Sequence, residues 1–158
     1  MNFDGDLSLL QRKMAASSAG VQRRQAVMEA LNVRSGQSIL DLGCGGGHLV
    51  EELARAVGPQ GKAFGLDPSK TQIQAARERC NHFDQATFFC CMADEIALNA
   101  ASCDAVASIQ TLEYIEDVDA ALSAVIPLLK TQSTFVNISI LWDHFKFHGA
   151  DEALSTPI

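Results

Sequence analysis

Residues 39–47 read Ile-Leu-Asp-Leu-Gly-Cys-Gly-Gly-Gly, a short apolar run that contains one acid, Asp41, and ends in a glycine-rich turn. A buried parallel strand that leads into a nucleotide-binding loop has this form, because glycines allow positive φ angles and let a ligand approach bare backbone. A second acid, Asp67, follows the next apolar run, residues 63–66. The two features together predict that a nucleoside binds across two neighbouring strand ends.

The spacing of the glycines distinguishes between cofactors. A dinucleotide fingerprint that starts at Gly43 requires glycine at position 48, where this chain has His48, and no lysine follows the loop as a Walker-type phosphate loop requires. An acid before the first glycine repels a pyrophosphate but attracts a sulfonium or an amino group, and S-adenosylmethionine (SAM) carries both. The loop therefore favours SAM, and an NAD-linked oxidoreductase is the weaker alternative.

The segments around the loop predict strands that alternate with helices. Apolar and β-branched runs predict strands at 38–42, 62–66, 86–92, 103–109 and 133–142. Helical patterns predict helices at 48–57, from about 69 to 81 and at 117–130, and Ser69 and Gln72 spell a capping box at the start of the second one. This alternation predicts an α/β fold, a doubly wound Rossmann-like parallel sheet of about five strands with helices on both faces.

The N-terminal region precedes the sheet. Residues 1–33 have helical spacing and predict an N-terminal helical cap, with a break at 15–20, and residues 34–158 predict the SAM-binding domain. The 158 residues are 47% hydrophobic, enough for one folded core. The net charge of -7 argues against a nucleic-acid partner, and no apolar run is long enough for a membrane span. We therefore expect a cytoplasmic protein.

The cysteines predict neither disulfides nor a zinc site. They are odd in number and scattered without metal-ligand spacing, which indicates reduced thiols: Cys44, Cys80, Cys90, Cys91 and Cys103. Asp143, His144 and His148 lie close in sequence, but the run alternates like a strand end and one more ligand is missing, so we expect no metal.

On these residues the chain resembles the class I SAM-dependent methyltransferases, especially the small-molecule group around quinone-biosynthesis and arsenite methyltransferases. Motif I of that family has the form that residues 41–47 have here, and Gly65-Leu66-Asp67-Pro68-Ser69 is similar to the second motif. The resemblance covers about residues 20 to 150. It implies that the glycine loop holds the methionine part of SAM and that Asp67 bonds both ribose hydroxyls.

The resemblance also implies further cofactor contacts. In the family an acid contacts adenine between the third strand and the segment that matches residues 102–104 here. Counting back from these residues without a gap places Met92 at that position, and a loop two residues shorter than the family's places Asp94 there. We prefer Asp94, with backbone contacts from Ala93 or Glu95. Residues 108–117 resemble the exit of the family's fourth strand, which lines the methionine end and the substrate mouth. The implied cofactor-binding residues are Asp41, Gly43, Cys44, Gly45, Gly47, Asp67, Pro68, Ala93, Asp94, Glu95 and Gln110.

The chain departs from the family pattern in its last third. After Lys130 the family has Pro-Gly-Gly, whereas this chain has Thr131-Gln132-Ser133, so we expect a different turn. The family also continues through a further helix and an antiparallel pair of strands, a hairpin that is truncated here. The fifth strand is then an apolar edge, which we expect a second subunit, the tail or a missing remainder to cover.

The resemblance implies transfer of a methyl group from SAM to a small-molecule acceptor, with S-adenosylhomocysteine (SAH) as product. The alternative is a SAM-binding module without turnover, or the cofactor half of a longer or oligomeric enzyme. No catalytic base stands out in the sequence. His144, Tyr114 and Glu113 are candidates by position alone.

Overall fold

The computed structural model describes residues 6–140 of the chain. Its strands are β1 (Ser38–Leu42), β2 (Lys62–Leu66), β3 (Ala86–Phe89), β4 (Cys103–Ile109) and β5 (Leu129–Ile138). Its helices are α1 (Asp6–Ala16), α2 (Ser18–Leu31), α3 (His48–Val57), α4 (Lys70–Arg79) and α5 (Val118–Val125), with 3-10 turns η1 (Ala93–Glu95), η2 (Leu112–Tyr114) and η3 (Ile126–Leu128).

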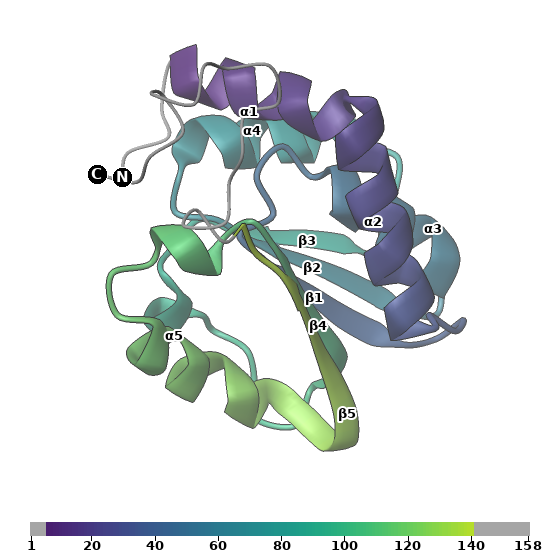
Figure 1. Cartoon of the computed structure of the whole chain (residues 1–158). Coiled ribbons are helices and arrows are strands. Elements are labelled where there is room, and N and C mark those ends of the chain that lie inside the picture. The colour runs from purple at the N-terminus through teal and green to yellow at the C-terminus, as the bar shows by residue number, and fades with distance from the viewer. Residues whose placement is uncertain (1–5, 141–158) are drawn as a thin grey trace.

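The strands form one parallel sheet in the order β3-β2-β1-β4-β5. The chain first winds from β1 toward β3 and then crosses back to β4, so the winding direction reverses between β1 and β4 (Figure 1). Open α/β sheets bind ligands outside the carboxyl ends of the strands at such a reversal. The predicted doubly wound fold is confirmed, and the reversal predicts a ligand site beside β1.

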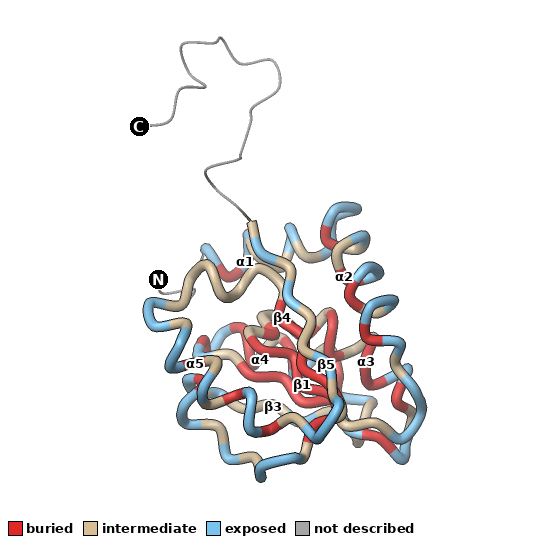
Figure 2. Tube along the Cα trace, turned by 60° about the horizontal axis from the view of Figure 1, so that its bottom comes forward, coloured by how far each residue is buried: buried red, intermediate tan, exposed pale blue. Residues whose placement is uncertain are grey.

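Strand β1 is buried on both faces because its side chains alternate between two cores. Ile39 packs with residues of α2, α3 and α4, whereas Leu40 and Leu42 pack with residues of α5, η1 and η3. Buried residues are concentrated in the central strands, and the outer sides of the helices are exposed (Figure 2). Coverage of both faces explains why residues 39–42 are apolar apart from Asp41.

The N-terminal helices break at Ser17, inside the predicted range 15–20. The Ser17 Oγ accepts a hydrogen bond from the Gly20 backbone N at 3.3 Å and caps α2. A Cβ at Gly20 would lie 2.2 Å from the carbonyl oxygen of Ala15, so only glycine lets the two helices turn this closely. Helix α2 joins the core through Val27 and Leu31, and α1 lies above α4 (Figure 1).

Three predicted boundaries were wrong. The strand predicted at 86–92 ends at Phe89, because its partner Leu66 is the last residue of β2. The helix predicted at 117–130 begins after its cap Asp117 but ends at Val125, since Pro127 has no backbone N–H to continue it. The strand predicted at 133–142 already begins at Leu129. Residues 141 and 142 of that prediction lie outside the described residues.

A bulge explains the early start of β5. Cys103 pairs with Leu129, but Ala105 pairs with Thr134, so β5 uses five residues where β4 uses two. Gln132, inside the extra segment, has a φ of 64°, in the left-handed region. The residues that replace the family's Pro-Gly-Gly are therefore accommodated as a bulge in the edge strand.

Within residues 6–140, no helix combines the length and the apolar character that crossing a membrane demands.

We predict that Gly47→Ala destabilises the protein more than Gly36→Ala. Both glycines have positive φ, 77° and 84°, which costs alanine about 1–2 kcal/mol. A Cβ at Gly47 would also lie 2.8 Å from the Cβ of Ala76 in α4, whereas nothing lies within 4 Å of one at Gly36. The clash adds about 1–3 kcal/mol, measurable by urea denaturation. Equal losses would contradict close packing of α3 on α4 at Gly47.

Candidate functional site

A cavity of about 960 Å³ opens at the carboxyl ends of β1, β2 and β4, and α1 and α2 line its opposite side. Most of the cofactor-binding residues expected from the sequence line this cavity: Asp41, Gly43, Cys44, Gly45, Asp67, Pro68, Ala93, Asp94 and Gln110. Met92, the alternative to Asp94, lines it too. Gly47 and Glu95 do not line it; Gly47 contacts α4, and Glu95 Oε2 accepts a hydrogen bond from the Met92 backbone N at 3.0 Å.

The glycine loop is tied to the end of β2. The backbone N atoms of Gly43 and Cys44 both donate to the carbonyl oxygen of Leu66, at 2.8 and 2.9 Å. A Cβ at Gly43 would lie 2.1 Å from the side chain of Thr111, so the loop also packs tightly against the exit of β4. The space beside Gly45 is open, with no atom closer than 4.0 Å to a Cβ there. The loop therefore offers bare backbone to the cavity.

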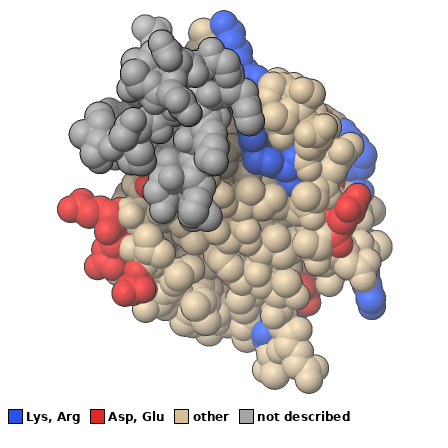
Figure 3. Space-filling model, in the orientation of Figure 1, with Lys and Arg blue, Asp and Glu red and all other residues tan. Residues whose placement is uncertain are grey.

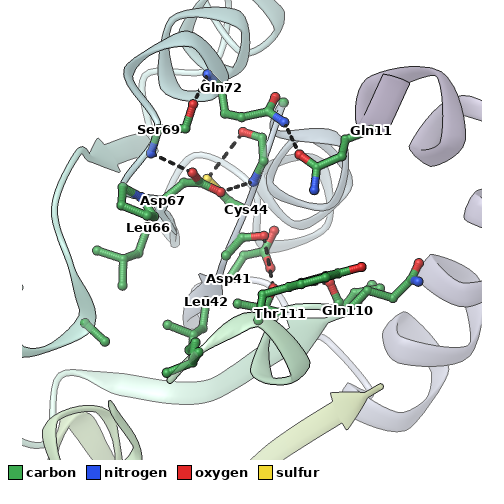
Figure 4. A pocket seen from close by; sticks show the side chains of 18 of the residues that line it. Gln11, Asp41, Leu42, Cys44, Leu66, Asp67, Ser69, Gln72, Gln110 and Thr111 are labelled. Carbon is green, nitrogen blue, oxygen red and sulfur yellow. Dashed lines mark hydrogen bonds between the residues drawn. The ribbon is translucent and has the colours of Figure 1, made fainter. Parts of the chain in front are cut away.

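The Asp67 carboxylate is oriented by two backbone donors. Its Oδ2 accepts a hydrogen bond from Gly45 N at 3.0 Å, and its Oδ1 accepts one from Ser69 N at 2.9 Å (Figure 4). Hydrogen bonds to a carboxylate are short and strong, so they hold the side chain at the rim of the glycine loop. The structure thus brings together the two acids and the glycines that the sequence singled out.

The predicted capping box is only half formed. Ser69 Oγ accepts from Gln72 N at 3.2 Å, as expected, but Asp67 takes the Ser69 N–H that the Gln72 side chain was expected to bind. The Gln72 side chain is 1% exposed and turns toward α1, where its Nε2 donates to Gln11 Oε1 at 2.7 Å and its Oε1 accepts from Arg12 at 3.4 Å. Gln72 therefore connects α1 to the site, a contact that no local sequence pattern signals.

Asp41 is buried below the loop. It is 3% exposed, and its register partners on β2 and β4 are Gly65 and Ala107. Burial, with a smaller effect from Asp67, raises the pKa of Asp41 to about 8, although Arg24 opposes the rise. The carboxyl group is therefore largely protonated at pH 7. The sequence predicts that Asp41 attracts a cation. A bound cation favours the ionised carboxylate, so this attraction develops fully only when the cation is bound.

Comparison with known proteins agrees with this geometry. Residues 33–152 match the sequence profile of a family described as "Methyltransferase domain", which is more than half of the chain. The chain belongs to this methyltransferase domain family. The fold agrees as well: a SAM-dependent methyltransferase from Aquifex aeolicus superposes with a TM-score of 0.68 at 19% identity, over 73% of this chain and 63% of that one.

Two curated relatives are longer than this methyltransferase domain. The chain is 28% identical over 143 residues to an uncharacterized 37.1 kDa protein in transposon Tn4556 of Streptomyces fradiae, covering 90% of this chain and 41% of the relative. It is 30% identical over 118 residues to a ubiquinone biosynthesis O-methyltransferase of Bradyrhizobium diazoefficiens, covering 75% of this chain and 46% of that protein. The chain thus spans less than half the length of either relative.

Two titratable side chains of the loop region are neutral in this methyltransferase domain. Burial raises the pKa of the Cys44 thiol well above its ordinary value, so Cys44 fills space rather than acting as a thiolate. Burial and the neighbouring Arg79 lower the pKa of His48 to about 4. Arg79 can only donate, so His48 Nε2, 3.2 Å from Arg79 Nη2, is an acceptor. His48 lines the cavity, although its sequence position signalled only a missing glycine.

The candidate bases separate in the structure. Tyr114 lines the cavity, and burial together with Glu113 raises its phenol pKa, which keeps it protonated. Glu113 does not line the cavity; its Oε1 accepts from the Ile140 backbone N at 3.3 Å, beyond the end of β5. His144, like Asp143 and His148, lies outside the described residues. Over residues 6–140, no His, Cys, Asp and Glu side chains are grouped to hold a metal ion.

We predict that Asp41→Asn changes how stability depends on pH. Between about pH 4 and 8 folded Asp41 keeps a proton that it loses on unfolding, so wild-type stability falls as pH rises through this window and levels off above the folded pKa. The slope is up to about 1.4 kcal/mol per pH unit. The advantage of Asp41→Asn over wild type should therefore grow from pH 6 to pH 8.5 in urea denaturation.

The matched control for this prediction is Asp94→Asn, which changes an exposed acid of the same cavity. It should follow the wild-type pH dependence. If Asp41→Asn also followed it, Asp41 would not be the buried proton carrier.

Proposed function

We propose that this domain binds SAM across the carboxyl ends of β1 and β2 and transfers its methyl group to a small-molecule acceptor, releasing SAH. The observation that carries the proposal is the Asp67 carboxylate, fixed by Gly45 N and Ser69 N beside a glycine loop that lines a cavity of about 960 Å³. The name of the Bradyrhizobium relative, a ubiquinone biosynthesis O-methyltransferase, supports methyl transfer. The net charge of -7 supports a small molecule rather than a nucleic acid as acceptor.

Each part of the cavity has a role in this proposal. The backbone of Gly43 and the open backbone at Gly45 receive the methionine part of SAM, and Asp67 accepts hydrogen bonds from the ribose hydroxyls. Adenine lies toward η1, where Asp94 is exposed at the cavity and Met92 is the alternative. Further contacts come from Cys44, Pro68, Ala93 and Gln110, and Asp41 faces the positive charge. Gly47 and Glu95 act indirectly, through packing on α4 and through the shape of η1.

Methyl transfer from SAM requires mainly that the reacting atoms are positioned correctly. SAM supplies a methyl carbon already activated by its sulfonium. The residues of the cavity hold the acceptor atom in line with that carbon, an effect worth up to about 7–11 kcal/mol when the orientation is good. A base is needed only for an acceptor that arrives protonated. Tyr114 is the one sequence-derived candidate on the described cavity wall.

We propose that residues 1–33 act as a cover over residues 34–158. Helix α1 contributes Gln11, Arg12, Met14 and Ala15 to the cavity wall. The bonds of the Gln72 side chain to Gln11 and Arg12 connect this cover to the helix that follows Asp67. The cover thus excludes water from the place where the acceptor meets the methyl group.

A second candidate function is a SAM-binding part of a larger assembly. Strand β5 is an edge of the sheet among the described residues, and its side chains are half-buried or exposed. A second copy of the chain or another polypeptide could pair with this edge. Light scattering of the purified chain, together with SAM affinity but no turnover until a partner is added, would support this candidate.

We predict that Asp67→Ala weakens SAH binding by about 1–3 kcal/mol in calorimetric titration, because the substitution removes a charged acceptor from the ribose. Asp84→Ala is the matched control, since Asp84 is an exposed acid that does not line the cavity. Asp67 also holds the loop, so thermal melting is measured for both variants. An unchanged SAH affinity in folded Asp67→Ala would contradict the proposed ribose site.

The function itself is tested with methyl-labelled SAM and a fractionated metabolite extract. We predict a labelled product that SAH inhibits, and SAH binding that NADH does not displace. Tighter binding of NADH than of SAH would favour the oxidoreductase alternative. Firm SAH binding without any labelled product would favour the module without turnover.

A further inference from the structure

The side of the cavity formed by α1 and α2 is basic, although the chain carries a net charge of -7. Three arginines line it: Arg12 from α1 and Arg23 and Arg24 from α2. Figure 3 shows Lys and Arg side chains over these two helices and a group of Asp and Glu side chains on the side of η2 and α5, with further acidic side chains beside the basic ones on the opposite side. Glu116 and Asp117 line the cavity from that acidic side.

Two of the three arginines are already used by the fold. Arg24 is 8% exposed; its Nε donates to Glu52 Oε1 at 2.7 Å and its Nη1 donates to the carbonyl oxygen of Ala15 at 2.5 Å. Arg12 Nη1 donates to Ser8 Oγ at 2.5 Å and to Gln72 Oε1 at 3.4 Å. These bonds join α1 to α2 and α4, and α2 to α3, and so hold the cover in place.

Arg23 is different. It is half-buried at the cavity wall, and within residues 6–140 its guanidinium has neither a hydrogen-bond partner nor an ion-pair partner. A guanidinium presents a planar fork of donors that matches a carboxylate or a phosphate. Its charge therefore faces the cavity available for a ligand.

The methionine carboxylate of the cofactor is not the natural partner of Arg23. A Cβ at Gly46 would lie 2.9 Å from side-chain carbons of Arg12, so Arg12 is the arginine that lies against the glycine loop. An anion seated on the loop would meet Arg12 first. Arg23 is left for the second ligand of the cavity.

We propose that the methyl acceptor carries a carboxylate or phosphate group and that Arg23 binds this group, which makes Arg23 a specificity-determining residue. The inference rests on the proposed function. The anion is held toward α2 while another atom of the acceptor, turned toward the strand ends, attacks the methyl carbon. That atom forms the new bond to carbon, the bond from carbon to sulfur breaks, and the electron pair stays on sulfur in SAH.

The first test measures the charge of the product. Methyl-labelled SAM is incubated with the chain and a metabolite extract, and the products are passed over an anion-exchange resin at pH 8. The anionic group is bound by Arg23 and not methylated, so the labelled product should be retained on the resin. A labelled product that flows through as a neutral or cationic species would overturn the inference and leave the proposed methyl transfer intact.

The second test uses defined ligands and variants. SAH-loaded protein is titrated with benzoate, with its neutral analogue benzamide, and with inorganic phosphate. We expect benzoate or phosphate to bind, and benzamide to bind at least about ten-fold more weakly than benzoate. Arg23→Gln should weaken anion binding by about ten-fold or more. Arg23→Lys should recover part of the loss. Lys13→Gln, which removes an exposed charge of α1 outside the cavity, should bind like wild type.

The SAH affinity separates the possible failures. It should be the same in Arg23→Gln and wild type. A loss of SAH affinity of about ten-fold in Arg23→Gln would assign Arg23 to the cofactor carboxylate and overturn the inference. Equal anion binding by wild type and Arg23→Gln would overturn it too, and so would a wild-type protein that binds no anion. Failure of the wild-type protein to bind SAH would instead overturn the proposed function.

Discussion

The site depends on one carbonyl oxygen at the end of β2. Leu66 O accepts hydrogen bonds from both Gly43 N and Cys44 N, which forces the turn after β1 to pass over the neighbouring strand. Asp67, the residue that follows β2, also contacts the loop, because its carboxylate accepts a hydrogen bond from Gly45 N. Backbone and carboxylate thus fix each other, so the protein's own hydrogen bonds hold the rim of the cavity.

The charges of the cavity are arranged in layers. Asp41, buried below the loop, is largely protonated because its surroundings do not favour an ion. Arg24 is neutralised by Glu52 and also donates to the carbonyl oxygen of Ala15 at the break between α1 and α2, and the side chain of Arg12 packs against the glycine loop. These compensated groups leave an acidic side at η2 and α5 and one unpaired guanidinium, Arg23, among the described residues of the wall. A cationic cofactor and an anionic acceptor fit such a division of charge.

Local patterns were sufficient for the central elements and insufficient for the edges of the sheet. The bounds of β1, α3, β2 and β4 agree with the prediction, because each is a short apolar or amphipathic run; glycine follows β1 and α3, and an acid follows β2. The C-terminal end of β3 and the start of β5 do not agree. β3 stops where its partner strand stops, and β5 absorbs extra residues as a bulge against β4, so both boundaries are properties of pairing rather than of local sequence.

The sequence by itself determined the parallel sheet, the glycine loop and the pair of acids at neighbouring strand ends, because these follow from periodicity and from the few residues that tolerate a tight turn. Only the tertiary structure decided the protonation of Asp41, the turn of Gln72 toward α1, and the difference between Arg23 and Arg24. Two adjacent arginines are identical in sequence terms. Which of them is neutralised depends on burial and on partners such as Glu52, 28 residues along the chain from Arg24, which only folding brings into contact.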